Sequence, residues 1–154
     1  MECPLFYTST IINDTATATT LVDNRSQSYA QISESLARKL SLPLLDVVPR
    51  ILGGVIKGPT IVIRHVTYLS LDIGGVKPAR MFAYVVPNQH EELILGRPWL
   101  KDNEVTLIAA EDKLHFGQYD LDLYSNQAME KKGIERPIQI MASTYAGLVR
   151  RSKK

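Results

Sequence analysis

β-Branched and apolar residues recur in short runs over most of the chain, which predicts a fold built from β-strands. Residues 5–12 and 15–22 form two such runs around the turn signal Asn13-Asp14, and together they predict a β-hairpin whose second strand ends at Asp23. Further strands are predicted at residues 60–65, 66–73, 79–87, 93–95, 105–109 and 113–116.

Helical spacing is clear at one place. Leu36 and Leu40 lie four residues apart within residues 33–40, Ser33 is a suitable N-cap, and Pro43 follows. A single helical turn is predicted at residues 98–101, with proline at an early position where its missing N–H costs nothing. The pattern therefore predicts an all-β protein with one short helix.

The apolar pattern weakens from Tyr119 onward. Residues 125–136 are polar and indicate a linker, whereas residues 138–141 favour a strand that leads into a short helix at residues 142–149. We expect residues 1–118 to form one folded domain and residues 119–154 to form a linker and C-terminal connector segment.

Composition excludes several classes of protein. A net charge of +2 over 154 residues argues against a dedicated nucleic-acid-binding domain. The single cysteine, Cys3, allows no intramolecular disulfide, so we expect an intracellular protein of the cytoplasm or nucleus. No apolar run approaches the roughly 18 to 20 residues of a membrane span. His65, His90 and His115 are scattered, so neither a metal nor another cofactor is expected.

The candidate chemistry lies in an ordered set of motifs between residues 5 and 117. An apolar strand delivers Asp23 to a turn formed by Asn24, Arg25 and Ser26. A glycine-rich segment follows the helix, and an Ile-Leu-Gly strand then precedes a short Trp-Leu helix. This set resembles the retropepsin-like aspartic proteases, and in particular those in the polyproteins of gypsy-type LTR retrotransposons.

The resemblance implies a closed β-barrel with one protease lobe per chain and with Asp23 as the catalytic residue. Such enzymes need two carboxylates that share one proton, so a second copy of the chain must supply the other aspartate in a homodimer. The implied ligand is an extended peptide or polyprotein segment under a mobile flap. The resemblance assigns the flap and substrate-binding residues Leu52, Gly53, Gly54, Val55 and Ile56, and the core motif Ile94, Leu95, Gly96 and Trp99.

One departure from the family motif affects activity. The family has Asp-Thr/Ser-Gly at the turn, and this chain has Asp23-Asn24-Arg25. Asn24 can donate and accept hydrogen bonds and so replace the usual hydroxyl in part. Arg25 brings two cations to the two-fold axis of a dimer, so either its side chain points outward from a remodelled turn or the aspartate pair is not catalytic. Two functions stay open: an endopeptidase with impaired catalysis, or an inactive homodimerisation or peptide-binding module.

Overall fold

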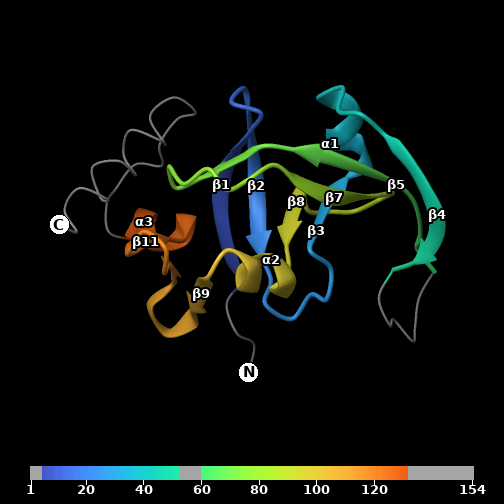
Figure 1. Ribbon diagram of the computed structural model, residues 1–154. Helices are drawn as coiled ribbons and strands as arrows, with labels where there is room; N and C mark the ends of the chain where they lie inside the picture. Colours follow the sequence, from blue (N-terminus) through green and yellow to red (C-terminus); the bar gives the residue numbers. More distant parts are fainter. Residues whose placement is uncertain (1–4, 53–59, 132–154) are drawn as a thin grey trace.

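The computed structural model describes residues 5–52 and 60–131, and within them it consists of one large sheet, one small sheet and three short α-helices (Figure 1). The strands are β1 (Phe6–Ile12), β2 (Ala16–Val22), β3 (Ala30–Ser33), β4 (Leu45–Ile51), β5 (Val62–Leu69), β6 (Leu71–Ile73), β7 (Met81–Val86), β8 (Leu93–Leu95), β9 (Val105–Ile108), β10 (Lys113–Phe116) and β11 (Leu121–Tyr124). The helices are α1 (Glu34–Lys39), α2 (Arg97–Asp102) and α3 (Asn126–Lys131), with a 3-10 turn at Ala109–Glu111.

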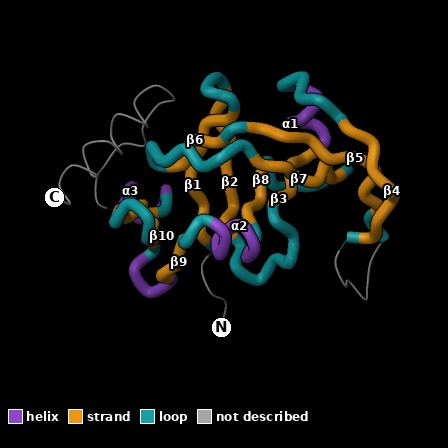
Figure 2. Tube along the Cα trace, in the orientation of Figure 1, coloured by secondary structure: helices purple, strands orange, loops and turns teal. Residues whose placement is uncertain are grey.

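The eight strands of the large sheet follow the order β4-β5-β7-β3-β8-β2-β1-β6. Two neighbouring pairs are parallel, β2 with β8 and β3 with β7, and the other pairs are antiparallel. The order begins at β4 and ends at β6, on opposite sides of the view in Figure 2. Over the described residues the sheet does not close on itself. The mostly β fold is thus confirmed, and the predicted closed barrel is not.

Local sequence signals placed the first hairpin and the first helix correctly. Asn13 and Asp14 both have positive φ, a conformation that these two residue types tolerate better than most, and they turn the chain between β1 and β2. Ser33 caps α1, because its Oγ accepts a hydrogen bond of 3.1 Å from the N–H of Leu36.

The prediction of one short helix was wrong, since the described residues contain three. The predicted helical turn at residues 98–101 is part of α2, and α3 was missed because its sequence is largely polar. Ala128 and Met129 are the buried residues of α3, which packs against β1. Two apolar residues that are adjacent in the sequence are too few to show a helical period. Only the folded chain, in which the segment packs against β1, therefore reveals this helix.

Strand boundaries also differ from the predicted ones. Residues 60–73 form β5 and the short β6, with a break at Ser70, whose N–H donates to Asn13 Oδ1 at 2.8 Å. The strands β3, β4 and β11 were not predicted. Leu121, at the start of β11, is buried in the core although it lies in the segment expected to begin the linker. The division into residues 1–118 and 119–154 stays a prediction.

A carboxylate of the loop before β8 is tied to the first strand. The hydroxyl of Tyr7 donates to Glu91 Oε2 at 2.8 Å, and this hydrogen bond, with partial burial, raises the pKa of Tyr7 above its usual value of about 10. Because folding raises the pKa of Tyr7, its hydrogen bond to Glu91 contributes fully to stability below about pH 10. This contribution is lost as the pH rises through the folded-state pKa of Tyr7.

We therefore expect the Glu91→Gln variant to titrate Tyr7 at a lower pH than the unmodified chain. Ultraviolet absorbance of ionised tyrosine follows the titration, with Tyr7→Phe as the variant that identifies the Tyr7 signal. An unchanged Tyr7 titration in Glu91→Gln would contradict the role of this hydrogen bond.

Candidate active site

Asp23 lies where two parallel strands end side by side. β2 and β8 pair in parallel, with Val22 opposite Leu95, so the residues that follow them, Asp23 and Gly96, meet at the same edge of the sheet. The N–H of Asp23 donates to the carbonyl of Leu95 at 2.9 Å. The Ile-Leu-Gly motif therefore positions the aspartate directly, although more than sixty residues separate them in the sequence.

The turn after Asp23 is closed by its own side chain. Asp23 Oδ1 accepts a hydrogen bond of 3.0 Å from the N–H of Arg25, and the N–H of Ser26 donates to the Asp23 carbonyl at 3.1 Å. This is the local bonding by which Asp stabilises turns. The Asp23 side chain keeps 28% of its surface exposed, so its carboxylate is oriented and still reachable.

Gly96 holds the loop that follows the turn. Its N–H donates to the carbonyl of Tyr29 at 3.0 Å, and the N–H of Arg97 donates to the carbonyl of Ser26 at 2.9 Å. A Cβ placed on Gly96 would overlap the carbonyl oxygen of Ser28. Glycine is required here because the backbones approach closely, and not for its φ, which at −97° suits any residue.

The other residues of the core motif lie in the core below Asp23 or at the groove. Leu95 and Trp99 are fully buried, at 0% exposure, whereas Ile94 reaches the surface of a groove. Tyr29 connects the loop to α2, since its hydroxyl donates to Asp102 Oδ2 at 3.1 Å. Burial and this hydrogen bond raise the pKa of Tyr29 above its usual value.

In the single chain, the Arg25 side chain points outward. It is 79% exposed, and its Nε lies 3.9 Å from Asp23 Oδ1, a distance at which an exposed ion pair contributes little. None of residues 23–26 has a positive φ, so the turn does not need glycine for its backbone angles. What Arg25 changes is the bulk and charge beside Asp23.

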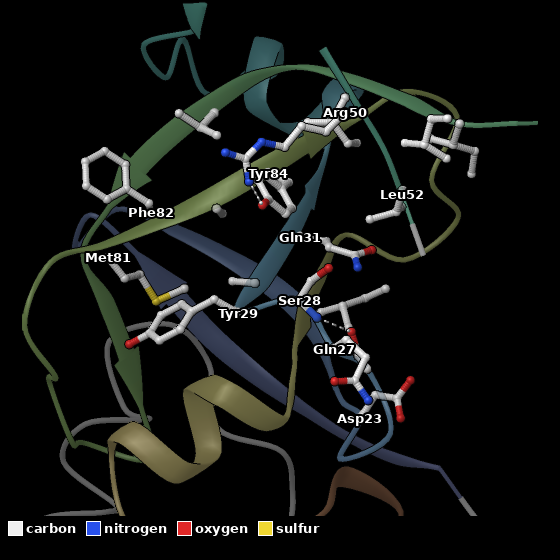
Figure 3. Close-up of a pocket in the computed structure, with 18 of the residues that line it drawn as sticks. Asp23, Gln27, Ser28, Tyr29, Gln31, Arg50, Leu52, Met81, Phe82 and Tyr84 are labelled. Atoms are coloured by element: carbon white, nitrogen blue, oxygen red, sulfur yellow. Dashed lines mark hydrogen bonds between the residues drawn. The ribbon is translucent and has the colours of Figure 1, made fainter. Parts of the chain in front are cut away.

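Asp23 lies at one end of a groove of about 930 Å³ (Figure 3). Of the residues predicted for the site, Asp23, Arg25, Ser26, Leu52 and Ile94 line it. Asn24 is exposed but does not line the groove, and Leu95, Gly96 and Trp99 lie in the core instead. The remaining flap residues predicted from the sequence, Gly53, Gly54, Val55 and Ile56, lie outside the described residues.

Much of the groove comes from residues that sequence analysis did not identify. Arg50, from β4, donates from Nη1 to the Tyr84 hydroxyl of β7 at 3.2 Å, and Phe82 is 60% exposed on the same strand. Phe82 and Tyr84 alternate with the buried Met81, Ala83 and Val85, but all five are apolar or aromatic, so no apolar–polar alternation in the sequence indicated an exposed face of β7. Nothing in the sequence placed β4 opposite β7.

The described part of the chain holds no group of three or more His, Cys, Asp or Glu side chains suited to a metal ion. Nor does any helix of residues 5–52 and 60–131 have the length and apolarity to cross a membrane. The chemistry that the site offers is that of one oriented, reachable carboxylate at the end of a groove, and water activation by a carboxylate pair requires a second such group.

The comparisons with known proteins agree with this geometry. The sequence model of a family described as aspartyl protease matches residues 8–99, which is more than half of the chain. The chain therefore belongs to this aspartyl protease family. No curated protein matches the chain.

Two solved structures have a similar fold. The retroviral protease-like domain of Ddi1 from Leishmania major matches with a TM-score of 0.55 and 21% identity, over 73% of this chain and 87% of that one. The EIAV protease, in complex with the inhibitor HBY-793, matches with a TM-score of 0.50 and 20% identity, over 70% of this chain and 93% of that one. The chain thus has a retropepsin-like aspartic protease fold.

Proposed function

We propose that this chain is the aspartic endopeptidase domain of a gypsy-type retrotransposon polyprotein, that it works inside the cell as a homodimer, and that its catalysis is impaired. The observation that supports peptide hydrolysis is the oriented Asp23 carboxylate at the end of the 930 Å³ groove. Cleavage of an extended peptide, compared between the unmodified chain and Asp23→Asn, tests the activity.

In the proposed reaction, Asp23 of each copy contributes one carboxylate to a pair that shares a proton. The ionised member takes a proton from water, and the protonated member donates a hydrogen bond to the carbonyl oxygen of the scissile bond. Water then adds to the carbonyl carbon, and collapse of the tetrahedral intermediate releases the amine, which receives a proton. Among the described residues that line the groove, Asp23 is the one carboxylate, so the proposed reaction requires two copies.

The proposed impairment of catalysis follows from the residues beside Asp23, namely Asn24 and Arg25. In a symmetric dimer the two turns lie near the axis, so the two exposed Arg25 side chains add bulk and positive charge beside the two carboxylates. A guanidinium beside each carboxylate places fixed positive charge where the family mechanism needs two carboxylates that share one proton. Asn24 supplies an amide where the family has a hydroxyl, and an amide both donates and accepts.

The second candidate is an inactive homodimerisation or peptide-binding module. The position of Arg25 beside Asp23, with Nε 3.9 Å from Oδ1, favours it, because binding in the groove needs no shared proton. Both candidates predict peptide binding, and they differ only in hydrolysis. A chain that binds peptides but does not cleave them, even after replacement of Arg25 with glycine, fits only the inactive module.

Both candidates also predict a homodimer. Sedimentation at increasing protein concentration should show a monomer–dimer equilibrium, because Asp23 and the groove beside it make up half of a protease site. Leu5, immediately before β1, is 49% exposed, and we expect the segment from Leu5 to Ile12 to contribute to the interface. A chain that stays monomeric at high concentration would overturn the dimer.

A further inference from the structure

The charged side chains that line the groove are mostly of one sign. Of the described residues that line it, Arg25, Arg50 and Arg80 are the cations and Asp23 is the carboxylate. Among the described lining residues there is no lysine, histidine or glutamate. The groove therefore has an excess of positive charge that the protein as a whole, with a net charge of +2, does not lead one to expect.

Arg50 is held over the groove by Tyr84 of β7, the strand beyond β5 in the same sheet. Its Nη1 donates to the Tyr84 hydroxyl at 3.2 Å, and Figure 3 shows the guanidinium extending from β4 toward Tyr84, with Asp23 at the other end of the groove. A guanidinium has five N–H donors, and the tyrosine uses one of them. No carboxylate of the described residues forms an ion pair with Arg50.

Arg80, a second cation that lines the groove, is also oriented by an aromatic ring. The guanidinium carbon of Arg80 lies 4.3 Å from the centroid of the Tyr68 ring, a cation–π contact. Around these cations the lining is apolar, with Ile51, Leu52 and Phe82. Apolar surroundings exclude water when a ligand binds and so strengthen a charge pair.

We propose that Arg50 and Tyr84 form a subsite for an acidic side chain, so that the groove selects acidic extended peptides. This inference rests on the proposed peptide-binding function and names the chemistry of the peptide. The planar guanidinium matches a carboxylate with two parallel hydrogen bonds, and the Tyr84 hydroxyl limits the rotation of Arg50. An extended peptide also fits because β4, which carries Arg50, is an edge strand of the sheet and offers backbone groups for pairing.

The test is a binding measurement on the full chain with labelled peptides. A neutral, mostly apolar peptide is compared with versions that contain one Glu, Gln or Lys at each position in turn, by fluorescence anisotropy at low and high salt. At one or more positions, the Glu peptide should bind about fivefold more tightly than the Gln peptide, as for a favourable exposed ion pair. High salt should reduce this preference.

Variants assign the preference to Arg50. Arg50→Gln should abolish the preference for Glu, and Arg50→Glu should reverse it toward the Lys peptide, which a purely structural role for Arg50 does not explain. Arg64→Gln is the matched control, since Arg64 is an exposed arginine on β5 that does not line the groove. It should leave the preference unchanged.

The outcomes separate this inference from the function on which it rests. Equal binding of Glu and Gln peptides would overturn the acidic subsite and leave peptide binding intact. A preference that survives in Arg50→Glu would overturn the assignment to Arg50. Failure of all peptides to bind would overturn the peptide-binding function itself. Stronger binding of a short single-stranded oligonucleotide than of the acidic peptide would show that the cations serve a different ligand.

Discussion

Replacing Arg25 with glycine should raise the peptidase activity of the dimer by about a hundredfold, the scale on which small misplacements of catalytic groups lower a rate. In the single chain the Arg25 guanidinium lies 3.9 Å from Asp23, and a dimer brings two such groups to one axis. Glycine removes both the bulk and the charge. The backbone of the turn allows the change, because Arg25 N–H, which donates to Asp23 Oδ1 at 3.0 Å, is retained in glycine.

The measurement is hydrolysis of a polyprotein-derived peptide at mildly acidic pH, with and without pepstatin. Arg25→Gln separates the two causes, since it removes the charge and keeps most of the bulk. Asp23→Asn in the Arg25→Gly background should abolish the gain. If the unmodified chain already cleaves the peptide as fast as Arg25→Gly does, and loses this activity on Asp23→Asn, the proposed impairment is wrong.

Replacing Gly96 with alanine should cost about 3 to 5 kcal/mol of the free energy of unfolding, in the range of severe overpacking. The added Cβ overlaps the carbonyl oxygen of Ser28, which is backbone and cannot rotate away as a side chain can. The two hydrogen bonds that hold the active-site loop, from the N–H groups of Gly96 and Arg97, would have to shift with it. Peptide binding should fall together with stability.

Urea unfolding measures the effect, and Gly117→Ala is the matched control. A Cβ at Gly117 meets the Glu104 carbonyl oxygen at 3.2 Å, a contact that a displacement of a few tenths of an ångström relieves, so we expect a cost of only about 1 kcal/mol. Equal losses in the two variants would show that the close approach of Gly96 to Ser28 does not stabilise the fold.

Local signals in the sequence predicted the elements that depend on near neighbours. The hairpin turn at Asn13-Asp14, the N-cap at Ser33 and the strand that ends on Asp23 follow from residue type and short spacing. Such features form from contacts between residues a few positions apart, so a single sequence contains them. The polar helix α3 lacked such a signal, because its packing against the distant strand β1 determines it. The edge strand β4 pairs with the next strand, β5, but Pro49 interrupts its run of strand-forming residues.

In the candidate site, too, some features could be predicted from the sequence and others only from the folded chain. The ordered motifs identified Asp23 and its turn, and the Ile-Leu-Gly strand, because each has a distinctive residue in a distinctive local setting. Two things required the folded chain: the outward direction of Arg25, and the meeting of Arg50 with Tyr84 across a groove. The second depends on the register of β4, β5 and β7, and register is set by the burial of whole faces of the sheet.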